Sequence, residues 1–350
     1  MPDQPRSNRQ RRMIGVALGP RTTLEAESVL REAAVSADIA ELRLDYMDEY
    51  DLTRLLRNRP CPVIVTNRAE REGGRFRGSE ADRIKPLLQA IDFGVEFVDI
   101  EHDAVELISD RGQTRLIASY HDFQETPRNF LEIHQALASK GADVVKVVGM
   151  ARQLRDNLLV FDALAQSSVP TIAIAMGESG LVSRILALRY DACLLTFATL
   201  GTGERVAPGQ ISVATMRDVY HAQSISPQTA VYALLGVGVI STDTIASLNA
   251  RTRPLGLDAV WVPLAASGNA GDTPADVVWS FRRLGVAGYV VDASGQESAA
   301  LAVDDAVSRG PDGRINAIRR IGDQLIGAWA ASDAEAVAFA LGHLATLTSP

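Results

Sequence analysis

The sequence predicts an α/β protein in which a (β/α)₈ barrel is followed by a smaller α/β domain. Three observations predict this. Eight short β-branched or apolar runs recur through the first 220 residues, helix-patterned segments lie between them, and the polar residues of the runs fall mostly toward their carboxyl ends. In a barrel of parallel strands those ends converge on one face, where the βα loops build the active site.

The eight runs are the expected barrel strands, and they are nearly continuous in apolar residues, as is typical of parallel strands covered by helices. They lie at 12–18, 39–47, 62–68, 97–103, 114–122, 142–150, 170–176 and 194–200. Segments such as TLEAESVLREAAVSA and EADRIKPLLQAIDFG show the helical pattern between them. Residues 1–11 are polar and Arg-rich, and we expect a disordered tail there, in front of a barrel at 12–222.

The pattern changes after Val219. We expect a linker at 223–229, within the Ser- and Gln-rich stretch HAQSISPQT. The strand-like runs VYALLGVGVI, LDAVWVPL and VAGYVV follow, and an Ala- and Leu-rich helix is expected at 333–347. These features predict a second α/β domain over 230–350.

The composition favours a globular protein of the cytoplasm. The 35 basic and 43 acidic residues give a net charge of −8, which argues against a general binder of nucleic acid or anionic membranes. Two cysteines cannot form a disulfide framework, and the longest apolar runs are too short to cross a bilayer. His102, His134, His221 and His343 show no metal-ligand spacing and are expected to be surface or helix residues, so we expect no metal.

Lysine is scarce: the chain contains Lys85, Lys140 and Lys146 and no other lysine. Lys85 is expected on a helix surface and Lys140 at a helix end, where a cation complements the helix dipole. Lys146 lies among valines on a strand that should point into the barrel. Burial disfavours the charged ammonium and makes the nucleophilic amine more accessible, and such an amine forms an imine with a carbonyl carbon.

Other strand-end residues supply partners for that amine. His121, in SYHDF, is the natural acid–base group, and Glu101 is expected to orient its ring. Arginines at strand ends suggest an anionic substrate, and the planar guanidinium of Arg184 suits a carboxylate. The loop EREGGRFRGSE (70–80) follows the third strand and is a candidate lid, although a solvated loop has the same composition.

Taken together, several segments resemble type I 3-dehydroquinate dehydratase, in family order across residues 12–220. They are ELRLD, VIVTNR followed by EGGRFRGSE, VDIEHD, SYHDF, ADVVKV, AMGESGLVSR and APGQIS. The resemblance implies a cofactor-free barrel that is typically a homodimer and acts on 3-dehydroquinate. It implies that Lys146 forms the imine, that His121 is the proton donor and acceptor, and that Glu101 supports His121. The substrate-binding residues it implies are Glu41, Arg43, Arg68, Met176, Arg184 and Gln210.

One position departs from the family pattern, because Val206 stands where the family usually has serine. Loss of a hydroxyl contact is expected to weaken substrate binding by about 1 kcal/mol and to leave the chemistry in place.

The second domain is similar, more weakly, to the substrate-binding domain of shikimate dehydrogenase, through RPLGLDAVWVPL and GRINAIRRIGDQLIGAW. Thr242 and Thr244 correspond to that family's substrate-binding serines. Gln296, however, occupies the apparent position of the catalytic lysine, and no Gly-rich nucleotide-binding fingerprint follows. We expect a degenerate domain without dehydrogenase activity.

Two other functions remain open at this stage. A class I aldolase would share the barrel and the imine lysine but would not need the EGG lid or the SYHDF and APGQ segments. A pseudoenzyme that senses shikimate-pathway acids would be favoured by Val206 and disfavoured by the presence of Lys146, His121 and Glu101 together.

Overall fold

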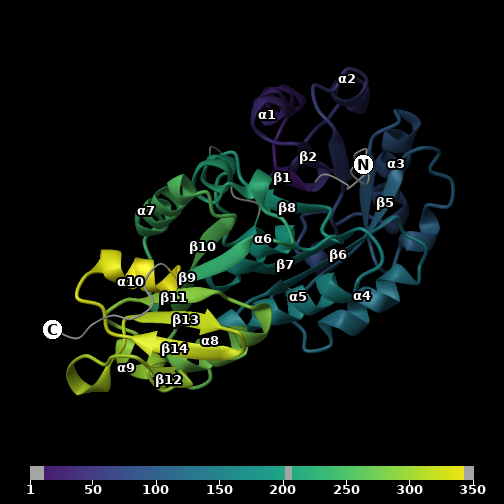
Figure 1. Ribbon diagram of the computed structural model, residues 1–350. Coiled ribbons are helices and arrows are strands. Elements are labelled where there is room, and N and C mark those ends of the chain that lie inside the picture. Colours follow the sequence, from purple (N-terminus) through teal and green to yellow (C-terminus); the bar gives the residue numbers. More distant parts are fainter. Residues whose placement is uncertain (1–11, 202–206, 343–350) are drawn as a thin grey trace, which may run out of the picture. The chain divides into compact units, whose positions relative to one another are not determined.

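The computed structural model describes residues 12–201 and 207–342 (Figure 1). The expected tail at 1–11, Val206 and His343 lie outside these described residues. The described residues divide into two compact units, one containing 12–151, 159–201 and 207–217, the other containing 152–158 and 218–342. This division falls a few residues before the linker expected at 223–229.

The first unit is a barrel of eight parallel strands, which confirms the predicted fold class. The strands are β1 (Met13–Leu18), β2 (Ile39–Arg43), β3 (Val63–Thr66), β4 (Phe97–Glu101), β5 (Arg115–His121), β6 (Val144–Met150), β7 (Thr171–Met176) and β8 (Leu195–Ala198). Their order is β7-β6-β5-β4-β3-β2-β1-β8, so neighbours in sequence pair in space and β1 pairs with β8. A parallel bridge between Thr171 and Cys193 links the two ends of this sheet.

Helices connect the barrel strands, as Figure 1 shows. They are α1 (Thr23–Ser36), α2 (Leu52–Leu56), α3 (Glu80–Asp92), α4 (Phe130–Ala138), α5 (Asn157–Gln166) and α6 (Leu181–Leu186). Side-chain caps begin several of them: the hydroxyls of Thr22 and Ser79 accept a backbone N–H in the first turn of α1 and α3. Such caps satisfy amide groups that have no partner within the helix.

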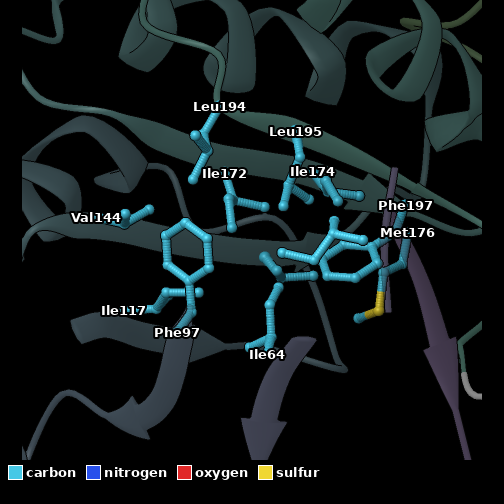
Figure 2. Close-up of a cluster of buried hydrophobic side chains, with 12 residues drawn as sticks. Ile64, Phe97, Ile117, Val144, Ile172, Ile174, Met176, Leu194, Leu195 and Phe197 are labelled. Carbon is cyan, nitrogen blue, oxygen red and sulfur yellow. The ribbon is translucent and has the colours of Figure 1, made fainter. Parts of the chain in front are cut away.

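A cluster of buried side chains fills the barrel interior (Figure 2). Its members are Ile39, Ile64, Phe97, Ile117, Val144, Val148, Ile172, Ile174, Met176, Leu194, Leu195 and Phe197. Alternate residues of a strand point to the same side of a sheet. A polar residue two positions after one of these apolar residues therefore also points into the barrel. Such polar residues lie near the carboxyl ends of the strands, and this alternation positions the site.

The second unit contains a six-stranded mixed sheet of order β10-β9-β11-β13-β14-β12. Its strands are β9 (Ala230–Val237), β10 (Ala259–Ala266), β11 (Gly288–Val291), β12 (Asp305–Ala306), β13 (Ala317–Ile321) and β14 (Gln324–Ala328). Its helices are α7 (Thr242–Thr252), α8 (Pro274–Phe281), α9 (Gln296–Ala299) and α10 (Asp333–Ala340). The helix expected at 333–347 thus ends at Ala340 within the described part of the chain.

Within residues 12–201 and 207–342, no helix has both the length and the apolar character needed to cross a membrane.

Candidate active site

A pocket opens at the carboxyl ends of the barrel strands, and most of the expected site residues line it. Those that do are Glu41, Arg43, Arg68, His121, Lys146, Met176, Arg184 and Gln210. Glu72, Gly73, Phe123 and Phe197 also line the pocket, and Glu101 is absent from its walls. The alternation of strand side chains explains most of the gathering, because these residues project from the active-site end of a strand or from the loop that follows, while Arg184 projects from α6, which follows β7.

Lys146 is buried among carboxylates. It lies on β6 between Val144 and Val148 of the interior cluster, so its side chain points into the barrel. Its Nζ lies 2.8 Å from Asp99 Oδ2 and 3.2 Å from Glu41 Oε1. The amine is therefore held in one place by two carboxylates.

Asp99 is a site residue that the sequence reasoning did not select. It lies two positions after Phe97 of the interior cluster and binds both Lys146 and the guanidinium of Arg68, whose Nη2 is 2.5 Å away. Burial alone would raise the pKa of Asp99, but the positive charges of Arg68 and Lys146 outweigh it and lower this pKa. Asp99 and Glu101 lie two residues apart on β4, so both side chains point to the inside of the barrel. This alternation is the sequence signal that could have identified Asp99.

His121, at the end of β5, is paired with Glu72 rather than with the expected Glu101. Its Nδ1 lies 3.1 Å from Glu72 Oε2. Burial lowers the pKa of His121 well below its ordinary value, and the nearby cations Arg68 and Lys146 lower it further. A proton on Nδ1, donated to the carboxylate, leaves Nε2 as the nitrogen available for proton transfer.

The expected contact between Glu101 and His121 was wrong. Glu101 is fully buried and accepts hydrogen bonds from the guanidinium of Arg83 and from the backbone N–H of Ala69, 2.8 Å away. Both of its oxygens are thus used to attach α3 and the segment after β3 to the barrel.

The segment 68–76, at the start of the candidate lid, brings Glu72 into the pocket. Backbone bonds from Phe76 N to Arg68 O (3.2 Å) and from Gly74 N to Ala69 O (3.0 Å) close it into a tight turn. A Cβ on Gly74 would lie 2.0 Å from the carbonyl oxygen of Arg68, so no side chain fits there. The paired glycines allow the chain to fold back on itself and aim Glu72 at β5.

Glu72 is a carboxyl group whose buried position favours its protonated form. Burial raises its pKa to about 8, and the neighbouring carboxylates Glu101, Asp99 and Asp103 act in the same direction while Arg68 opposes them. With the pKa of His121 lowered and that of Glu72 raised, the two groups titrate as a pair rather than separately.

The three arginines of the pocket differ in how far their charge is already neutralised. Arg43 makes two bonds to Asp45, of 2.8 and 2.7 Å, and Arg68 binds Asp99. Arg184 instead donates to the backbone carbonyl oxygens of Phe197 (3.2 Å) and Pro208 (3.1 Å). Its Nε has no hydrogen-bond partner among the described residues.

Arg184 therefore lies in the pocket without a carboxylate partner in the described part of the chain. Burial lowers its pKa to about 10, which leaves it positively charged at neutral pH. A buried cation of this kind favours an anion from outside the protein.

No group of His, Cys, Asp and Glu side chains that could hold a metal ion occurs within 12–201 and 207–342.

In the second unit, a pocket beside β9, β11 and α7 includes Thr244, Gln296 and Asn316, while Thr242 is exposed at the start of α7. The side chain of Gln296 donates weakly to Val291 O, at 3.4 Å. The amide of Asn316 bonds the backbone of Ala330 at both ends, at 2.9 and 2.7 Å. The side-chain amides of Gln296 and Asn316 thus bond to the backbone of the second unit.

The fold and the site define a class: a (β/α)₈ barrel with a buried lysine, an imidazole–carboxylate pair and an unneutralised arginine at its active-site face. The family model of type I 3-dehydroquinase matches residues 14–227, and the chain belongs to this family.

Known proteins similar to this chain include separate enzymes and fusions. It is 33% identical over 216 residues to a 3-dehydroquinate dehydratase of Methanococcus maripaludis, covering 59% of this chain and 98% of that protein. It is 31% identical over 242 residues to the chloroplastic bifunctional 3-dehydroquinate dehydratase/shikimate dehydrogenase of Arabidopsis thaliana. That match covers 66% of this chain but 40% of the longer plant protein.

Solved structures give the same two kinds of relative. The 3-dehydroquinate dehydratase of Geobacillus kaustophilus matches with a TM-score of 0.52 and 26% identity, over 61% of this chain and 90% of that one. The dehydroquinate dehydratase and shikimate dehydrogenase of S. pombe AroM matches with a TM-score of 0.53 and 25% identity, over 92% of this chain and 65% of that one. The second likeness extends beyond the barrel into the second unit.

Proposed function

We propose that this chain is a 3-dehydroquinate dehydratase, which removes water from 3-dehydroquinate to give 3-dehydroshikimate, a step of the shikimate pathway. The observation that carries the proposal is the gathering of Lys146, the His121–Glu72 pair and Arg184 around one pocket. Membership in the type I 3-dehydroquinase family supports it, as do the names of the relatives.

The first stage makes the substrate ketone an electron sink. The neutral amine of Lys146 adds to the C3 carbonyl carbon, and loss of water from the adduct leaves a protonated imine. Lys146 first releases a proton to the carboxylate of Glu41, whose Oε1 lies 3.2 Å from Nζ, and the same proton then leaves with the hydroxyl of the adduct as water.

The second stage transfers one proton twice through His121. Nε2 of its neutral ring removes the C2 proton, the electron pair of that bond passes to the imine nitrogen, and an enamine forms. The enamine then expels the C1 hydroxyl, which leaves as water with the proton held by the imidazolium. Hydrolysis of the imine returns the amine of Lys146 and releases the product.

The remaining pocket residues are assigned to substrate recognition. Arg184 binds the substrate carboxylate, because it is a buried cation whose Nε donates no hydrogen bond to the described residues. Glu41, Arg43, Arg68 and Gln210 bind hydroxyl groups, and Met176 forms an apolar wall.

The test is conversion of 3-dehydroquinate by the purified full-length chain, followed by the ultraviolet absorbance of the conjugated enone. Steady turnover supports the dehydratase. Carbon–carbon cleavage of the substrate would instead indicate the aldolase, and binding without turnover would indicate the pseudoenzyme that senses pathway acids.

Glu72→Gln is expected to lower kcat roughly ten- to a hundredfold, less than loss of an acid–base group itself, because an amide orients the ring without the carboxylate charge. In the wild type, kcat/KM should fall as the pH is lowered through the pKa of the Glu72–His121 pair. Burial raises the pKa of Glu72 in this pair to about 8, so the fall is expected as the pH drops below that value. The protonated pair has no free base at Nε2. A pH profile of both proteins checks this, and a Glu72→Gln profile identical to wild type contradicts it.

For the second unit, we propose that it has no shikimate dehydrogenase activity, since Gln296 occupies the expected position of a catalytic lysine. The full-length chain is expected to show no oxidation of shikimate with NADP at any pH between 7 and 10. Detectable reduction of NADP that depends on shikimate would refute this assignment. The homodimer and the cytoplasmic location stay predictions.

A further inference from the structure

A second histidine contacts the acid–base pair from the side opposite His121. His102 follows β4 directly, and its Nδ1 lies 3.1 Å from Oε1 of Glu72, whose other oxygen lies 3.1 Å from Nδ1 of His121. One buried carboxylate thus bridges two imidazole rings. The side chain of His102 is 37% exposed, against 10% for His121, so the chain of contacts runs from the pocket toward solvent.

His102 makes contacts with its ring and with its backbone besides the contact with Glu72. It makes an edge-on contact with the ring of Tyr120, with centroids 5.4 Å apart. Its backbone carbonyl accepts a bond of 2.6 Å from Nζ of Lys140, and its backbone N–H donates to Ser119 O at 2.8 Å. The ring of His102 thus contacts Glu72 and Tyr120, and two backbone hydrogen bonds hold the residue itself after β4, so His102 is more constrained than the ordinary surface residue expected from the sequence.

We propose that His102 is a positioning residue for the acid–base step: its Nδ1–H donates to Oε1 of Glu72 and holds this carboxylate ionised and directed at Nδ1 of His121. The inference rests on the proposed dehydratase function. With both oxygens of Glu72 accepting N–H bonds, His121 is held in the tautomer whose Nε2 is free to take the substrate proton.

The direction of the effect follows from hydrogen bonding to a charged group. A donor to the carboxylate favours its ionised form, so removal of His102 makes the Glu72–His121 pair hold its proton to higher pH. The groups that surround this pair are Arg43, Arg68, Arg71, Asp99, Glu101, Asp103, Tyr120, Lys140 and Lys146. All of these residues are retained in both His102 variants, and both variants lose the ring contact with Tyr120, so the two variants are compared against a common background.

The test compares His102→Leu with His102→Asn. Leucine fills the space without a donor, whereas the side-chain nitrogen of asparagine is as many bonds from Cα as Nδ1 and can still donate to Glu72. His102→Leu is expected to move the acid limb of kcat/KM upward by about one pH unit, a shift that corresponds to about 1.4 kcal/mol. His102→Asn should stay within about 0.3 pH units of wild type. Equal profiles for wild type and His102→Leu, or an equal shift in both variants, would overturn the proposal.

Two further measurements separate this role from a structural one. In a Glu72→Gln background, His102→Leu should add no further shift, because the carboxylate it acts through is gone, and an additive loss contradicts the proposal. Lys140→Met, which removes the contact to the backbone of His102 but leaves the ring, is the matched control and should keep the wild-type profile.

Nitrogen-15 chemical shifts of the His121 ring give a readout that does not need turnover. They should report a proton on Nδ1 in wild type, and a titration displaced to higher pH in His102→Leu. If the wild-type chain shows no dehydration, the proposed function fails, and the nitrogen shifts still decide whether His102 controls the tautomer of His121.

Discussion

Lys146→Met is expected to lower kcat for dehydration by about four orders of magnitude or more, because methionine matches the length of the side chain and has no amine to form the imine. The same change removes the cation between Asp99 and Glu41, whose oxygens lie 2.8 and 3.2 Å from the lost nitrogen, and leaves Arg68 to neutralise Asp99 alone. Loss of one member of a buried charge cluster is expected to reduce the free energy of unfolding by about 3 kcal/mol. A coupled assay and urea unfolding measure the two effects.

A matched variant separates chemistry from folding. Lys146→Arg keeps a cation between the carboxylates but offers a guanidinium, which does not form imines under these conditions. It should fold more stably than Lys146→Met and be equally inactive. On the wild type, borohydride reduction with 3-dehydroquinate should produce a substrate-dependent mass adduct on the peptide that contains Lys146. Turnover that persists in either variant would exclude the mechanism.

His121→Asn is expected to lower kcat by about 10²- to 10⁴-fold, the usual contribution of a positioned acid–base group. The side-chain amide of asparagine can still donate to Glu72 from near the position of Nδ1, which in His121 lies 3.1 Å from that carboxylate. The substitution therefore removes Nε2 and little else. The measurement is the single-turnover rate of enone formation.

Imine formation depends on Lys146 rather than on the His121 ring, so the His121→Asn protein should still be trapped by borohydride in the presence of substrate. A variant that neither turns over nor traps substrate would place His121 in substrate binding instead. A variant that turns over at the wild-type rate would exclude His121 as the proton carrier.

The sequence by itself determined the barrel and the identity of its amine. Eight apolar runs, most of them with polar residues toward their carboxyl ends, correspond to β1 through β8, and strand periodicity alone directs the side chain of Lys146 inward. The pocket collects Lys146 from β6, His121 from the end of β5 and Arg184 from α6, which follows β7, since parallel strands and the segments after them meet on one face. Local pattern and the topology that follows from it are sufficient for such residues.

Only the tertiary structure decided which carboxylate serves which partner. Glu101 ends β4 and is the carboxylate that the sequence places beside His121, yet it binds Arg83, while Glu72 contacts His121 from 49 positions away in the chain. That choice depends on how the glycine-containing turn folds back over β3, where a Cβ on Gly74 would meet the carbonyl oxygen of Arg68. The contact of His102 with the same carboxylate depends on this turn as well. Strand periodicity specifies the direction of a side chain on a sheet, but the position of a loop carboxylate is set by long-range contacts that no local pattern encodes.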